Sequence, residues 1–185
     1  MKKLLLILIL TFSFQTLSKA DDISDFEIEG ISIGDSALDF YSVKQIKDNY
    51  QNWFEPKYGA ATIIESSDNY DEIQLMYEFN DSNYKIVAIS ALKYVDPSYC
   101  LNKIDDIKVE IKNLFDENIK EKKKKTFKHS EDKSGKSKVT SIDFILKKNK
   151  ASIIVACYDW SKQMKYSDNL RISVRTNKYK QYISK

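Results

Sequence analysis

The stretch DPSYCLNKIDDIKVEIKNLF, residues 96–115, decides the fold, because it contains the clearest helix signal in the chain. Asp96 before Pro97 is typical of a helix N-terminus, since Asp caps free backbone N–H groups and Pro fits the first helical position. Apolar residues then recur at spacings of three and four, which places them along one side of a helix. They are Leu101, Ile104, Ile107, Ile111, Leu114 and Phe115. The pattern predicts one long amphipathic helix.

Strands are predicted on both sides of this helix. Before it, short polar turns separate three apolar runs, as in antiparallel hairpins, and the runs are 60–65, 72–79 and 84–95. After it come three more runs, at 139–146, 151–160 and 170–176. We therefore expect an α+β fold, in which a mostly antiparallel sheet of about six strands carries the long helix on one face. Without strict βαβ alternation, a doubly wound nucleotide-binding sheet is not expected.

Shorter elements are expected at the two ends of the chain and in one loop. Alternation predicts a strand over 28–33, and capping patterns predict short N-terminal helices over 37–41 and 43–52. Residues 179–183 are expected to form a terminal helix or tail. Residues 120–138 hold nine Lys and almost no apolar side chains, which indicates a Lys-rich mobile loop.

The first 20 residues have the pattern of a secretory signal peptide. A positive start, Met1-Lys2-Lys3, precedes an apolar run that ends near Phe14, and small residues stand at Ser18 and Ala20. The apolar run is too short to span the roughly 30 Å of membrane hydrocarbon. We therefore expect a signal peptide over 1–20, a single α+β domain over 21–185, no stable membrane insertion after signal removal, and a periplasmic or secreted location.

Signal removal would change the charge balance. Of the 30 basic residues, Lys2, Lys3 and Lys19 lie in the signal segment, so 27 remain against 27 acidic residues. The mature chain is then formally neutral. Nucleic-acid binding needs a net or clustered positive field, so it is not expected as a function.

The two cysteines, Cys100 and Cys157, predict one disulfide, because an even number of cysteines in an oxidising compartment usually pairs. Cys100 lies four residues before Ile104 on the predicted helix. On the strand over 151–160, Cys157 shares a face with Val155, and the long helix would cover that face. The alternative is a thiol nucleophile, which needs a basic or His-rich setting that neither cysteine has in the sequence.

Catalytic and metal-binding motifs are incomplete. Gly34-Asp35-Ser36-Ala37 looks like the nucleophile block of GDSL-type hydrolases, but the chain lacks their downstream Asp-x-x-His block. The simpler interpretation is that Ser36 or Asp35 caps a helix. The only histidine, His129, lies far in sequence from either cysteine, so no zinc spacing exists. We assign no catalytic residue, no metal ligand and no cofactor.

Aromatic residues and arginines suggest a binding surface. All 12 Tyr lie in the mature chain, and several aromatic side chains follow the strand over 151–160. Such residues suit recognition, because they bury large areas at low entropy cost, but they are also common in cores, here against the N-terminal helices. The two arginines alternate with Leu170, Ile172 and Val174. The candidate partner-binding residues are Tyr158, Trp160, Tyr166, Arg171 and Arg175.

A resemblance rests on two segments. FEIEGISIGDS, residues 26–36, resembles the start of the mature region in small exported proteins of Pelagibacter-type marine alphaproteobacteria. CYDWS, residues 157–161, together with DNLR, residues 168–171, is similar to their C-terminal region. The resemblance implies a periplasmic location and the cysteine pair. It implies no activity.

The function that the sequence favours is a periplasmic binding or interaction domain without catalytic activity. Export, neutral charge and the surplus of Tyr and Trp support this hypothesis. One alternative is a carrier of a small apolar ligand in a cleft between sheet and helix, where such pockets form. Another is an enzyme of a type that no motif reveals. The expected partner is an unknown protein or a small apolar ligand.

Overall fold

The computed structural model describes residues 20–64, 67 and 69–184, which fold around one sheet with antiparallel pairing between all neighbouring strands. The strand order is β1-β2-β3-β4-β9-β8-β7-β5, with β6 beside β7. The strands are β1 (Tyr50–Gln51), β2 (Tyr58–Ile64), β3 (Glu72–Glu78), β4 (Ile86–Tyr94), β5 (Ile119–Glu121), β6 (Lys125–Lys128), β7 (Lys138–Leu146), β8 (Ser152–Asp159) and β9 (Asn169–Arg175). The predicted α+β class and mostly antiparallel sheet are confirmed.

The prediction of about six strands is wrong, because the sheet has nine within the described residues. The six predicted runs correspond to β2, β3, β4, β7, β8 and β9. The additional strands β1, β5 and β6 are two, three and four residues long, too short for a visible alternation. All four residues of β6 are exposed. The segment expected to be a loop, 120–138, therefore holds β6 and part of β5.

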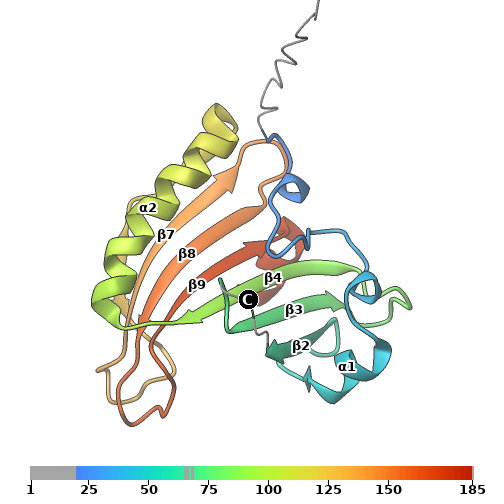
Figure 1. The fold of residues 1–185 in the computed structure, drawn as a ribbon, viewed down its shortest axis with the longest axis horizontal. Coiled ribbons are helices and arrows are strands. Elements are labelled where there is room, and N and C mark those ends of the chain that lie inside the picture. The colour runs from blue at the N-terminus through green and yellow to red at the C-terminus, as the bar shows by residue number, and fades with distance from the viewer. Residues whose placement is uncertain (1–19, 65–66, 68, 185) are drawn as a thin grey trace, which may run out of the picture.

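The long helix α2 (Pro97–Phe115) lies across β7, β8 and β9 on one face of the sheet (Figure 1). Asp96 caps it by accepting a hydrogen bond from the backbone N–H of Tyr99, at 2.9 Å. The helix buries Cys100, Ile104, Ile111 and Phe115. The predicted apolar stripe is corrected at two positions, because the side chains of Leu101 and Leu114 are 41% and 37% exposed.

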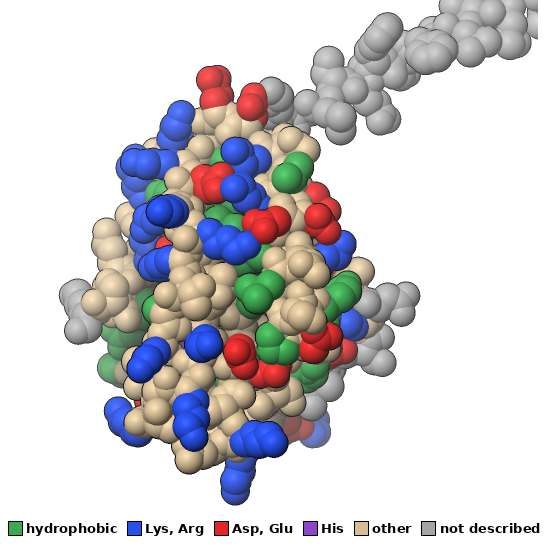
Figure 2. Space-filling model, turned by 90° about the vertical axis from the view of Figure 1, so that its left-hand side faces the viewer, with side chains coloured by type: hydrophobic (Ala, Val, Ile, Leu, Met, Phe, Trp, Pro, Cys, Tyr) green, Lys and Arg blue, Asp and Glu red, His purple; other side chains and the backbone are tan. Residues whose placement is uncertain are grey.

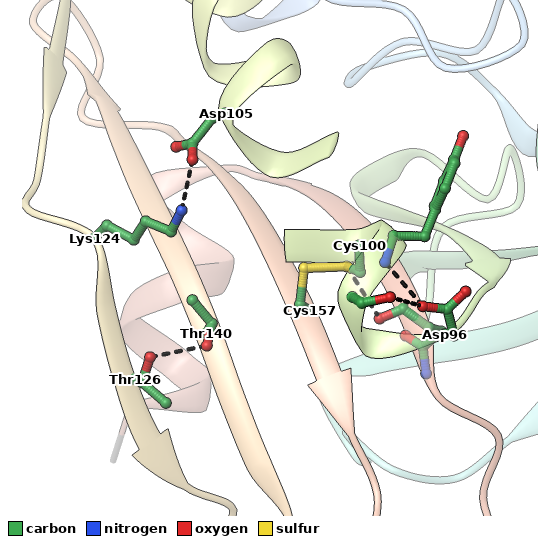
Figure 3. Close-up of a disulfide and its surroundings, with 10 residues drawn as sticks. Asp96, Cys100, Asp105, Lys124, Thr126, Thr140 and Cys157 are labelled. Carbon is green, nitrogen blue, oxygen red and sulfur yellow. Dashed lines mark hydrogen bonds and ion pairs between the residues drawn. A yellow bond between two sulfur atoms is a disulfide. The ribbon is translucent and has the colours of Figure 1, made fainter. Parts of the chain in front are cut away.

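A disulfide ties the first turn of α2 to β8, as predicted. Cys100 and Cys157 are bonded, with their Cα atoms 5.7 Å apart (Figure 3). Both side chains are buried in the core between helix and sheet. The ion pair of Lys124 with Asp105, at 2.8 Å, holds the β5–β6 connection against the same helix (Figure 3).

The N-terminal segment continues the layer of α2 over β2, β3 and β4. It contains the 3-10 turns η1 (Ile23–Asp25) and η2 (Ala37–Asp39) and the helix α1 (Val43–Asp48). These are shorter than the predicted helices over 37–41 and 43–52. Ser42 and Gln45 do form a capping box, but the chain leaves the helix after Asp48 to pair β1 with β2.

The strand predicted over 28–33 is wrong. Glu29 and Gly30 both have positive φ, at 52° and 75°, which a two-residue turn of type I′ requires. Ile28 and Ile31 therefore bond to each other across the turn, with N···O distances of 3.0 and 2.9 Å. Both isoleucines point into the core. Alternation in the sequence here reflects a tight turn rather than an extended strand.

The last helix, α3 (Asn177–Ile183), covers part of the opposite face of the sheet. Its Tyr179 is buried against Tyr58, with ring centroids 5.2 Å apart, in a second apolar cluster that includes Met76 and Ala88. The predicted terminal helix is thus present. The predicted signal peptide, apart from Ala20, lies outside the described residues.

Candidate binding surface on the open face of the sheet

The candidate site lies on the face of the sheet opposite α2, here called the open face. On β9, Ile172 and Val174 belong to the core beneath α2. Alternation along the strand therefore turns Arg171, Ser173 and Arg175 to the open face. The two arginines lie opposite the apolar side of this strand, as the alternating pattern predicts. α3 covers the open face over Tyr58, Met76 and Ala88, on the side of β9 where Arg175 lies.

Small residues flank Arg175 on the open face, whereas Leu92 of β4 lies beside Arg171 and Ile154 of β8 lies beside Ser173. Ser173 is paired with Ser90 of β4, and their buried Oγ atoms are 2.8 Å apart. Arg175 lies between Ala88 of β4 and Ser152 of β8 in the register of the sheet. Because these neighbours are small, they leave room for long side chains to lie along the sheet.

The arginines have no carboxylate partner among the described residues. The Nε–H groups of Arg171 and Arg175 are both buried and donate no hydrogen bond, and neither guanidinium forms an ion pair with a described carboxylate. Burial is the largest effect and lowers the pKa of Arg175, as does the charge of Arg171, while Tyr158, Tyr179 and Asp143 oppose the shift. Burying an unpaired charge costs several kcal/mol. Stability alone therefore does not account for this pair, and a function on the open face would.

The carboxylates closest in the register have other partners. Asp143 lies two strands from β9 and contacts Lys122, with an Nζ to Oδ2 distance of 3.8 Å. Glu72 lies on the other side and accepts hydrogen bonds from Gln74, at 2.6 Å, and from the hydroxyl of Tyr94, at 2.7 Å. Neither carboxylate neutralises an arginine by direct contact. The centre of the open face therefore keeps a positive charge.

Three of the predicted binding residues gather in an aromatic cluster at the end of β8. The rings of Tyr158 and Trp160 are stacked, with centroids 5.4 Å apart. Tyr166 meets Trp160 edge-on at 4.9 Å and is 63% exposed. The guanidinium of Arg171 lies over the ring of Tyr158, at 4.8 Å. Arg175 lies further along β9, so four of the five predicted residues touch directly and the fifth shares their face.

His129 is a member of this cluster that the sequence did not indicate. Its ring lies 4.4 Å from that of Trp160. The sequence placed His129 in a loop, but β6 pairs with β7 and carries it to the end of the sheet. In the structure, the hydroxyls of Thr126 on β6 and Thr140 on β7 bond each other at 2.8 Å (Figure 3). In the sequence, only Thr126 and Phe127, two residues that favour strands, hint at this pairing.

Hydrogen bonds fix the loops that carry the aromatic cluster. Asp132 accepts three bonds, from the N–H of Ser134 and from the N–H and hydroxyl of Ser137, at 2.9, 2.8 and 2.6 Å. These bonds, the hydroxyl of Ser137 first, hold the pKa of Asp132 far below its ordinary value. The Ser137 hydroxyl also accepts from the N–H of Ser161, at 2.9 Å, and so joins the two loops. The cluster therefore sits on a fixed support.

A cleft lies on the other side of the sheet, between α2, the N-terminal segment and the strands. This cleft has a volume of about 650 Å³, within the range of small-ligand pockets. Its walls include Phe26, Tyr70, Ile107 and Leu170, while charged groups such as Glu110 stand at its rim. It occupies the place that the sequence predicts for a ligand between sheet and helix.

On the side of the molecule that carries α2, many charged side chains form ion pairs, unlike the two arginines of the open face. Blue basic and red acidic side chains lie beside one another there, with apolar groups between them (Figure 2). Lys108 and Lys112 of α2 both contact Glu121 of β5, at 2.8 and 3.4 Å. Lys103 pairs with Asp106 at 3.2 Å. No comparable pairing exists for Arg171 or Arg175 among the described residues.

Comparison with protein-family models, curated proteins and solved structures finds no match, so the function is inferred from the molecule itself. In the part of the chain that the structure describes, no group of three or more His, Cys, Asp or Glu side chains could hold a metal ion. No described helix is long and apolar enough to cross a membrane. Ser36, from the hydrolase-like motif, caps η2 and donates to the carbonyl of Asn83 at 2.6 Å.

Proposed function

We propose that this chain is an exported, non-catalytic binding domain that recognises its partner with the open face of the sheet and the adjoining aromatic cluster. One observation carries the proposal: both arginines of the chain lie on this face without a described carboxylate partner, and Arg171 contacts the partly exposed aromatic cluster. Arginines and large aromatic side chains dominate the energy of binding surfaces. The disulfide between Cys100 and Cys157 supports the proposed periplasmic or secreted location, because such bonds persist in oxidising compartments.

Trp160 makes the aromatic cluster directly observable. The chain has two Trp, and the other, Trp53, is 49% exposed at a distance in the fold from β8. A Trp53→Phe variant would therefore report only on Trp160. We expect its fluorescence to change saturably with fractions of a small-molecule extract from the source organism. Adding Tyr158→Ala should weaken that binding by roughly thirtyfold, as expected for a residue worth about 2 kcal/mol.

A matched control separates binding from folding. Tyr99 is half exposed on α2 and lines the cleft on the other side of the sheet. Tyr99→Ala removes a similar side chain and should leave the Trp160 response unchanged. If Tyr158→Ala instead lowers the melting temperature sharply, the aromatic cluster is part of the core. If no fraction alters Trp160 fluorescence, the open face is not the binding surface.

A carrier of a small apolar ligand is the second candidate function, favoured by the cleft of about 650 Å³ beneath α2. Ile107 lines it and is half-buried, so Ile107→Trp would fill the cleft without disturbing the disulfide. Under this hypothesis, protein purified gently from its source releases an organic molecule on denaturation, and the Ile107→Trp variant releases none. Equal release from both proteins, or none from either, rejects the carrier hypothesis.

A further inference from the structure

We infer that Arg171 and Arg175 together bind a small ligand that carries at least two oxyanion groups, carboxylate or phosphate. The inference rests on the proposed function and names the chemistry of the ligand on the open face. A guanidinium offers a planar fork of donors that matches both kinds of oxyanion, so it fits this role better than an ammonium group.

The spacing of the two arginines defines the site. They are four residues apart on one strand, so their Cα atoms are roughly 13 Å apart and their side chains share a face. Between them lies only Ser173, whose hydroxyl bonds Ser90. Beside Arg175, the hydroxyl of Ser152 is buried without a hydrogen-bond partner, although it can donate one. These serines are only 2–3% exposed, so they support the two arginines from below, and the guanidinium groups are the donors that face a ligand.

The surrounding charges favour an anion. Lys122 contacts Asp143 of β7, at 3.8 Å, and Lys180 of α3 donates to the carbonyl of Lys150, just before β8, at 2.8 Å. Asp143 is the carboxylate on their side, and Lys122 is its ion-pair partner. Glu72, on the side of β3, accepts from two neutral groups and leaves Arg171 uncompensated. The basic groups therefore exceed the acidic ones around the two arginines.

The elements at the two ends of β9 limit the size of the ligand. α3 follows β9 directly, and its Tyr179 covers the sheet beside Ala88, the neighbour of Arg175. At the other end, Tyr158 lies beneath the guanidinium of Arg171 and belongs to the aromatic cluster. A molecule with two anionic groups fits between these boundaries. A polymer that runs along β9 would have to cross α3 or the aromatic cluster.

The chain offers an unusually direct test, because Arg171 and Arg175 are its only arginines. An NMR spectrum of arginine Nε–H groups therefore contains two signals, which single Arg→Lys variants assign. At low ionic strength, titration of wild-type protein with citrate or pyrophosphate should shift both signals saturably. Acetate and inorganic phosphate, each with one anionic group, should bind about tenfold more weakly. The tighter of the citrate and pyrophosphate series identifies carboxylate or phosphate as the natural chemistry.

Variants complete the test. Arg171→Lys and Arg175→Lys keep the positive charge but lose the fork, so each should weaken binding of the better probe by about tenfold. Lys47→Gln on α1, which changes an exposed charge away from the open face, should leave binding unchanged. Because the titration uses wild-type protein, it stands even if an Arg175 variant fails to fold.

A shift of one arginine signal alone, or of neither at millimolar probe, overturns the two-arginine site. Such a failure is distinct from failure of the proposed function. If Trp160 still responds to an extract fraction while the arginine signals do not respond to any anion, the open face binds a ligand of other chemistry. If neither Trp160 nor the arginines respond, both proposals are rejected.

Discussion

The same strands form both faces of the sheet, but the residues that they present on the two faces differ in polarity. Beneath α2, β8 presents Ile153 and Val155, both fully buried, together with a disulfide. On the open face, the neighbouring strand β9 presents two arginines and a serine, with Ala88 and Ser152 beside Arg175. One face is closed by apolar contact, while the other keeps buried polar atoms without partners. Apolar burial accounts for the folding of the first face, whereas the second departs from what folding alone would favour.

The largest expected effect concerns the closed face. Replacing Cys100 and Cys157 together by Ser opens a loop with a sequence separation of 57. In the chain-entropy model, the free energy of unfolding should fall by about 4 kcal/mol. Urea unfolding with and without the two substitutions measures this difference. Binding of citrate or pyrophosphate by the fraction that remains folded should not change.

A smaller loss of stability is expected when the two faces are compared within one strand. Ile153 is fully buried beneath α2, whereas its neighbour Ile154 points to the open face and is only partly buried. Ile153→Ala should lower the free energy of unfolding by about 3 kcal/mol through a cavity in the core. Ile154→Ala should cost less than about 1 kcal/mol by the area that it buries. Equal losses in denaturant unfolding would mean that the open face is core as well.

On the open face, we expect a substitution that leaves the free energy of unfolding unchanged or raises it. Arg175→Met keeps much of the side-chain volume but removes a partly buried charge that has no described partner. The free energy of unfolding should stay equal or rise by about 1 kcal/mol, while anion binding is lost. Thermal unfolding and the citrate titration measure the two effects. A loss of stability above about 1 kcal/mol would reveal that Arg175 has a structural partner.

The smallest expected effect concerns the support of the aromatic cluster. The pKa of Asp132 is lowered in the folded protein, chiefly by the hydroxyl of Ser137, so the ionised form favours folding. This contribution is fully present above the ordinary value of 3.8 and is lost as the pH falls below it. Asp132→Asn should therefore lower the melting temperature near neutral pH, and the difference from wild type should shrink in acid. A constant difference across the range would show that Asp132 is not responsible.

Much of the fold was readable from the sequence because its long elements alternate strongly. The six longer strands and α2 each contain several apolar residues at the correct spacing, and the pairing of Cys100 with Cys157 followed from two such patterns. The short strands gave no comparable signal. β6 exposes all of its residues, so its Lys-rich sequence indicates a loop until β7 is placed beside it. The sequence around Glu29 and Gly30 resembles that of a strand, because the isoleucines on both sides of the turn are buried.

The candidate site was only partly predictable. Alternation on β9 placed Arg171 and Arg175 on one side, and the aromatic residues after β8 suggested a surface. The arginines lack carboxylate partners because the sheet register brings only Asp143 and Glu72 near them. Lys122 contacts Asp143, and Gln74 and Tyr94 donate hydrogen bonds to Glu72. His129 entered the cluster through long-range pairing of β6. No local pattern encodes either fact.

An amide NMR map of the labelled protein during titration with citrate and pyrophosphate tests the contrast between the faces most directly. The account predicts that shifted residues cluster on β9, β4 and β8 around Ser173, Ser90 and Ser152, and that the middle of α2 stays unchanged. Shifts centred on Ile107 and the cleft beneath α2, with none around Ser173, would contradict it and would place binding on the closed face.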